Sequence, residues 1–296
     1  MIKYQNIAII ASFFGLWINS FLPKDFEIII GFVLILSFGI LHGANDIALI
    51  VNVNNAKKAS NFYKILIYYM VIVLFGALLF STLPWLALTL FIVFSGYHFG
   101  EQQWHLKLTA ISNNFVRALF HMVYGLLVLF LLFVFHSAEV QKIVFAITGI
   151  SVPPLYYLLI LKFLIPTYLV ISFYLYFRYE AFKKVVFTEL FYLILYAILF
   201  KVSTLIWGFA LYFILWHSIP SIIDQIKFLY GKVSLSHFKL YFKAAFIYWL
   251  ASLAGILLLY LLFRDEKIFN ALFFSFLASI TFPHVVVIQR MFGKNK

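Results

Sequence analysis

Four of the chain's eight histidines lie inside apolar stretches that are long enough to cross a lipid bilayer. They are His42, His98, His217 and His284. An ionisable side chain in a bilayer is energetically costly, so such residues usually have a polar partner and a function. Neutral imidazole is also a common metal ligand. We therefore interpret the four histidines as candidate ligands of one metal ion.

Membrane helices must position these histidines, because the chain is 65% hydrophobic, 21% aromatic and only 11% charged. Soluble domains carry about 25% charged residues, so the composition excludes that class. About 20 apolar residues cross the hydrocarbon core as a helix, and runs of this length recur throughout the chain. We predict an all-α, polytopic membrane protein, a single domain over residues 1–296 with about ten transmembrane helices in one bundle. The predicted spans are 5–22, 26–52, 62–82, 85–106, 114–135, 153–177, 186–200, 204–226, 241–263 and 268–290.

The basic residues predict the orientation of these spans. With the N-terminus in the cytoplasm, sixteen of the 22 lysines and arginines fall on the cytoplasmic side, five fall outside and one lies within a span. Such an excess is the pattern of the positive-inside rule. We therefore expect both termini in the cytoplasm and a multi-pass protein of the inner (plasma) membrane. This distribution accounts for the net charge of +12 without a nucleic-acid partner.

The four histidines are predicted to lie at one depth. The spans that carry them all run from the outside to the cytoplasmic side. Each histidine lies thirteen to sixteen residues after the predicted start of its span. A difference of three residues corresponds to about 5 Å along a helix axis, which is within the error of a predicted boundary. The four rings are thus expected to meet in the cytoplasmic half of the membrane.

Acidic side chains accompany three of the histidines. Asp46 and Glu101 follow His42 and His98 by about one helical turn, and Asp224 follows the third histidine by two turns. A metal-bound histidine commonly donates its second ring N–H to a carboxylate or a carbonyl. The three carboxylates are therefore candidates to orient the ligands. Capping of helix ends near the headgroups is the alternative role.

Glycines flank two of the four rings. Gly43 follows His42 directly, and Gly96 and Gly100 lie on either side of His98. Small residues in membrane helices permit close approach of a neighbouring helix. We therefore expect close contacts at these positions, or room for a ligand.

The ligand set leaves the metal and the function open. Four imidazoles suit iron, zinc or copper, and the absence of cysteine excludes thiolate sites. A structural zinc site would fill every coordination position, whereas iron can keep positions open for O₂ or substrate. The absence of a Gly-rich phosphate loop predicts no organic cofactor. A proton-coupled transporter that uses the same residues as a relay remains an alternative, as does a membrane hydroxylase or desaturase of lipids.

At the histidine motifs the chain resembles the Brp-like family of membrane β-carotene 15,15′-dioxygenases. The segment Leu41-His42-Gly43-Ala44-Asn45-Asp46 is similar to a family pattern Pro-His-Gly-Ala-x-Asp. The segment His98-Phe99-Gly100-Glu101 matches a second pattern. Trp216-His217 matches a third pattern in part, and Pro283-His284 followed by Arg290 matches a fourth.

Two positions depart from the family pattern. Leu41 stands where the family tends to have proline, and Ser221 stands where a second histidine is expected four residues after His217. If that second histidine is a family ligand, this chain has lost it. If His217 and His284 bind the metal, the site is intact. The shared depth of the four histidines favours the intact site.

The resemblance implies an enzyme that uses Fe(2+) and O₂ to cleave the central double bond of β-carotene, or of a related carotenoid, to retinal. It implies iron bound by the four histidines, with Asp46 and Glu101 orienting imidazoles. It also implies a functional link to a microbial rhodopsin, which would use the retinal.

Overall fold

The chain folds into helices throughout the part that the structure describes. The structure is a computed structural model, and it describes residues 2–53, 59–262 and 266–294. Within these ranges there is no strand. The predicted all-α class is therefore confirmed.

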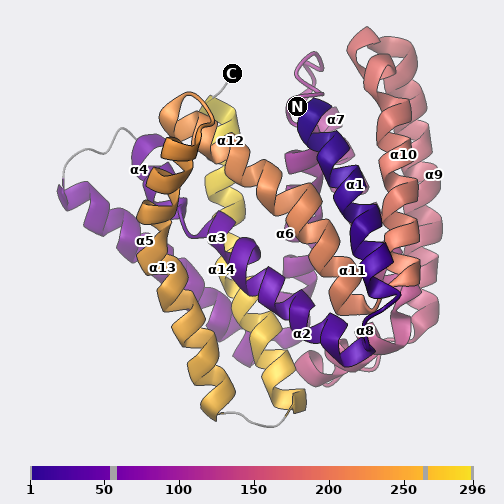
Figure 1. Cartoon of the computed structure of the whole chain (residues 1–296). Coiled ribbons are helices and arrows are strands. Elements are labelled where there is room, and N and C mark those ends of the chain that lie inside the picture. The colour runs from indigo at the N-terminus through magenta and orange to yellow at the C-terminus, as the bar shows by residue number, and fades with distance from the viewer. Residues whose placement is uncertain (1, 54–58, 263–265, 295–296) are drawn as a thin grey trace. The chain divides into compact units, whose positions relative to one another are not determined.

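Helices occupy the positions of all ten predicted spans (Figure 1). Eight of the spans are unbroken helices or nearly so: α1 (Ile2–Asn19), α5 (Ala59–Thr82), α6 (Pro84–Trp104), α7 (Asn114–Phe135), α9 (Pro154–Arg178), α10 (Glu180–Val202), α13 (Leu235–Leu262) and α14 (Glu266–Lys294). The predicted end of the ninth span, residue 263, lies outside the described residues. A further short helix, α8 (Ser137–Thr148), lies between α7 and α9.

The two remaining spans are irregular, and each contains a π-helical turn. The second span consists of α2 (Lys24–Leu34), the π-helix η1 (Ile35–Gly39), α3 (Ile40–Gly43) and, after a two-residue turn, α4 (Asp46–Val53). The eighth consists of α11 (Leu205–Tyr212), the π-helix η2 (Phe213–Ser218) and α12 (Ile219–Tyr230). π-Helical turns are rare and occur frequently at functional sites.

Eight helical segments of the described chain are long and apolar enough to cross a membrane. They indicate a membrane protein. The other two predicted spans, α1 and α6, are not among the eight. The number of ten spans and the cytoplasmic location of both termini stay predictions.

Local sequence sets several helix ends. The Asn113 side chain accepts hydrogen bonds from two backbone N–H groups in the first turn of α7. Pro84 and Pro154 begin α6 and α9, where a missing N–H costs nothing. Gly149 and Gly231 follow α8 and α12 with positive φ values of 70° and 79°, a conformation that favours glycine.

The chain divides into two compact units, each drawn from three segments of the sequence. The first unit contains Met1–Ile35, Ser95–Gln141 and Val152–Pro220, and the second contains Leu36–Phe94, Lys142–Ser151 and Ser221–Lys296. In the first unit α7 packs on α9 and α10, and α11 packs on α2. In the second unit α14 packs on α4, α5 and α13. The prediction of a single domain stays a prediction.

Glycine permits the closest helix packing in the first unit, between α6 and α7. A Cβ atom on Gly125 would lie 1.7 Å from the carbonyl oxygen of Gly96. A Cβ atom on Gly100 would lie 1.8 Å from the carbonyl oxygen of His121. The predicted close approach at Gly96 and Gly100 is therefore confirmed, and it holds the segment that carries His98 against α7.

We expect the substitution Gly125→Ala to destabilise the protein by about 1–3 kcal/mol, because a backbone must shift to admit the added carbon. The measurement is the free energy of unfolding in detergent. Gly293→Ala, whose added carbon meets no atom within 4 Å, is the control and should leave stability nearly unchanged. Equal stability of the two variants would contradict the packing argument.

Candidate metal-binding histidines

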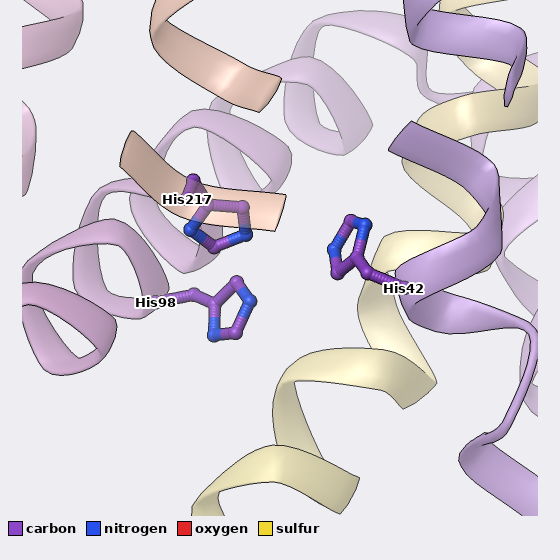
Figure 2. A group of neighbouring side chains, drawn as sticks. All are labelled: His42, His98 and His217. Carbon is purple, nitrogen blue, oxygen red and sulfur yellow. The ribbon is translucent and has the colours of Figure 1, made fainter. Parts of the chain in front are cut away.

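The four predicted histidines are buried, and each unit holds two of them as a pair. None of the four side chains is more than 5% exposed. In the first unit the ring centroids of His98 and His217 are 4.7 Å apart, and in the second unit those of His42 and His284 are 4.8 Å apart. Figure 2 shows the adjacent rings of His98 on α6 and His217 on η2, and it also draws His42 on α3.

Aromatic rings enclose the pair of the first unit. The ring of Phe213 stacks on that of His217, with the ring centroids 5.3 Å apart. The ring of Phe99 contacts the His217 ring edge-on, with the centroids 4.6 Å apart. The residue before His217 is anchored as well, since the indole N–H of Trp216 donates to the Ser12 hydroxyl at 2.9 Å. The π-helical turn η2 thus holds His217 between two residues with contacts of their own, Phe213 and Trp216, in a buried position.

A carboxylate orients the pair of the second unit. Nδ1 of His284 and Oδ1 of Asp46 are 2.8 Å apart, and both residues are buried. Because a carboxylate accepts hydrogen bonds, Nδ1 carries the proton. The other carboxylate oxygen accepts a hydrogen bond from the Tyr69 hydroxyl at 2.9 Å. Both Asp46 oxygens therefore have donors, as a buried carboxylate requires.

Asp46 follows His42 by four residues, a spacing that would place the two side chains on one face of a continuous helix. The expectation treated residues 42–46 as one continuous helical turn. The helix instead ends at Gly43 and restarts at Asp46, which turns the carboxylate toward His284. The role of Asp46 in orienting a metal ligand stays a prediction.

The ring of His42 is oriented by its own helix. Its Nδ1 is in contact with the carbonyl oxygen of Gly39, so Nδ1 is again the protonated nitrogen. In both histidines of the second unit the lone pair is consequently on Nε2. This is the tautomer and the supporting contact found at metal-bound histidines, where the second ring N–H goes to a carbonyl or a carboxylate.

Polar side chains satisfy the backbone where the helix breaks after α3. The amide of Gln225 donates to the His42 carbonyl at 2.8 Å and to the Ser221 hydroxyl at 3.1 Å. The Tyr241 hydroxyl donates to the Gln225 side-chain oxygen at 2.8 Å, and the Asn45 amide donates to the Tyr241 carbonyl at 2.9 Å. The network connects α3 to α12 and α13, and Ser221 takes part in it as a hydrogen-bond acceptor.

Sequence analysis missed these supporting residues. Tyr69, Gln225 and Tyr241 were not predicted to act near the histidines. The signal that could have found Gln225 is its uncharged polar side chain within an apolar span, because such a group needs an internal partner. A tyrosine hydroxyl carries no comparable signal in a chain with nineteen tyrosines.

The other predicted acidic residues have local contacts. Glu101 is buried and accepts a hydrogen bond from the Tyr97 hydroxyl at 3.2 Å. Oδ1 of Asp224 lies 3.8 Å from the Lys227 ammonium. The proposed roles of Glu101 and Asp224 in orienting histidines stay predictions.

Among the remaining histidines, two make local contacts that fit a structural role. Nε2 of His136 lies 2.7 Å from the carbonyl oxygen of Phe200, and Nδ1 of His237 lies 2.8 Å from that of Lys232. His121 is buried in α7.

A comparison with protein families matches residues 33–292 to the model described as beta-carotene 15,15'-dioxygenase. No curated protein and no solved structure matches the chain. The family match covers most of the chain and includes all four histidines of the two pairs. The chain therefore belongs to the beta-carotene 15,15'-dioxygenase family.

Proposed function

We propose that the chain is a membrane-embedded, iron-dependent oxygenase that cleaves the central double bond of β-carotene with O₂ to give retinal. Family membership supports dioxygenase chemistry and a carotenoid substrate. The observation that carries the metal assignment is the orientation of His42 and His284, whose Nδ1 groups face Gly39 and Asp46 oxygens. That arrangement puts the lone pair of each ring on Nε2, the form in which a neutral imidazole can bind a metal ion.

The proposed iron ligands are His42, His98, His217 and His284, all four of them buried. Four imidazoles without a thiolate fit iron(II), which keeps further positions for other ligands. Ser221, which stands where the family pattern places a second histidine, is bonded to Gln225 and is not part of the proposed set.

The reaction needs no proton transfer from the protein. One carbon–carbon double bond breaks, and each of its two carbons gains one oxygen atom of O₂, so no hydrogen is added or lost. Bound iron would supply the activation of O₂. Asp46, supported by Tyr69, holds the His284 ring in place, and Phe99 and Phe213 shield the first-unit pair from water. The protein thereby contributes positioning and a dry environment.

The distribution of basic residues supports a location in the inner (plasma) membrane with both termini in the cytoplasm. A carotenoid partitions into that bilayer, so the substrate reaches the protein through lipid. Retinal as a product supports a functional link to a microbial rhodopsin, the class of protein that binds it.

Single substitutions of His42, His98, His217 and His284 by alanine should each remove most of the bound iron, because each deletes one ligand. Iron content per protein, measured by elemental analysis after purification without chelator, checks this. His237→Ala is the control, since that ring bonds a loop carbonyl. A near-normal iron content in His284→Ala would remove that residue from the ligand set.

Asp46→Asn should weaken iron binding about 10–100-fold, because the carboxylate that fixes the His284 ring is lost. Tyr69→Phe should have a smaller effect, since one of the two donors to the carboxylate remains. The measurement is iron affinity by competition with a chelator. The control is Asp25→Asn, at an exposed position in α2, which should bind iron with the affinity of the unsubstituted protein. If Asp46→Asn matched it as well, Asp46 would be a helix-capping residue only.

A further inference from the structure

A partly open cleft of about 240 Å³ lies entirely within the second unit. Residues around the break between α3 and α4 line it, together with one side of each of the helices α5, α13 and α14. Its rim reaches the surface, because the lining residues Met70 on α5 and Ala251 on α13 are exposed. Its inner end includes Gly43 and the buried Asp46.

The chemistry of the cleft suits a hydrocarbon. Most lining side chains are apolar, and the polar ones are Asp46, Tyr69, Tyr248 and Ser252. Asp46 and Tyr69 bond each other, and the Ser252 hydroxyl donates to the Tyr248 carbonyl at 3.0 Å. Three of the four polar side chains are thus already engaged within the protein. A ligand that itself requires hydrogen bonds would gain little here, whereas an apolar ligand leaves no group unsatisfied.

The cleft is flanked by the two candidate spans that the protein buries least. Only 11% of the α5 span and 12% of the α13 span are buried within the protein, against 56% of the α7 span. The outward side chains of these helices are large and apolar, including Ile67, Leu74, Ile247 and Leu250. In a membrane these faces contact lipid, so the rim of the cleft meets the phase in which a carotenoid is dissolved.

The cleft shares its inner wall with the second histidine pair. A Cβ atom on Gly43 would lie only 3.7 Å from Nδ1 of His284, and Asp46 both lines the cleft and bonds that nitrogen. The volume is below the roughly 300–1,000 Å³ of pockets that enclose a whole drug-sized ligand. Since a carotenoid is longer than such a ligand, the cleft accommodates one arm of it.

We propose that this cleft takes up carotenoid sideways from the bilayer, between α5 and α13, and holds one apolar arm of it beside His284. The inference rests on the proposed function for its ligand class. Inside a membrane an apolar ligand exchanges one apolar surrounding for another, so shape and packing determine its retention. Side chains that fill the cleft should therefore expel the ligand.

The test measures β-carotene retained by chelator-washed protein purified from bacteria that accumulate this carotenoid. Retention by metal-free protein does not depend on turnover. Ala251→Phe on α13 and Val73→Phe on α5 fill the cleft from two different helices. Each should retain about tenfold less β-carotene per protein than the unsubstituted chain, the size expected from overpacking.

The matched controls are Ala254→Phe and Val71→Phe, on the same two helices at exposed positions outside the cleft lining. They should retain β-carotene as the unsubstituted protein does. The proposal fails if both cleft variants retain normal amounts, if the controls lose as much, or if the unsubstituted protein retains none.

The same samples separate this inference from the proposed function. Suppose that β-carotene retention depends on the cleft but the iron-loaded protein forms no retinal. That result would support carotenoid binding in the cleft and refute the proposed oxygenase function. Retinal formation with normal β-carotene retention in Ala251→Phe and Val73→Phe would support the oxygenase function and refute carotenoid binding in the cleft. Equal iron content in all variants would show that the substitutions leave the metal ligands in place.

Discussion

The hydrogen bond between Asp46 and His284 is the interaction on which the arrangement of the second unit depends. It joins α4 to α14 through a carboxylate that is withdrawn from solvent, and a buried carboxylate is tolerable only when donors meet its oxygens. His284 and Tyr69 are those donors. The bond also sets which nitrogen of His284 carries the proton. One contact therefore joins two helices and sets the tautomer of a proposed metal ligand.

That contact requires an interrupted helix, and an interrupted helix in a membrane needs other partners for its backbone groups. Gln225 supplies one for the His42 carbonyl, and Tyr241 holds Gln225 in turn. The π-helical turn η1 precedes His42, and the π-helical turn η2 contains His217. The irregular backbone thus coincides with two of the four candidate ligands, His42 and His217, whereas His98 and His284 lie on the continuous helices α6 and α14. Such a distribution is typical of membrane proteins with a function inside the bilayer.

Sequence reasoning predicted the helices well because bilayer thickness constrains their length. The spans 62–82 and 114–135 end at the same residues as α5 and α7. The start of α10 was placed six residues late, at 186, because the basic residues before it were assigned to a loop; the helix begins at Glu180. The sequence singles out the four histidines and Asp46 as candidates because ionisable groups are rare in apolar spans. The partner of Asp46, the π-helical turns and the role of Gln225 were not predicted, since each depends on contacts between segments distant in sequence.

The central proposal is that His42, His98, His217 and His284 all serve one oxygenase. The most direct test is the retinal content of bacteria that accumulate β-carotene and express the chain, measured by extraction and chromatography. The account predicts retinal with the intact chain, and none with His98→Ala from the first unit or His42→Ala from the second. Undiminished β-carotene and no retinal, with the intact protein present in the membrane, would contradict it. Retinal formation that survives either substitution would contradict the proposed set of four histidine ligands.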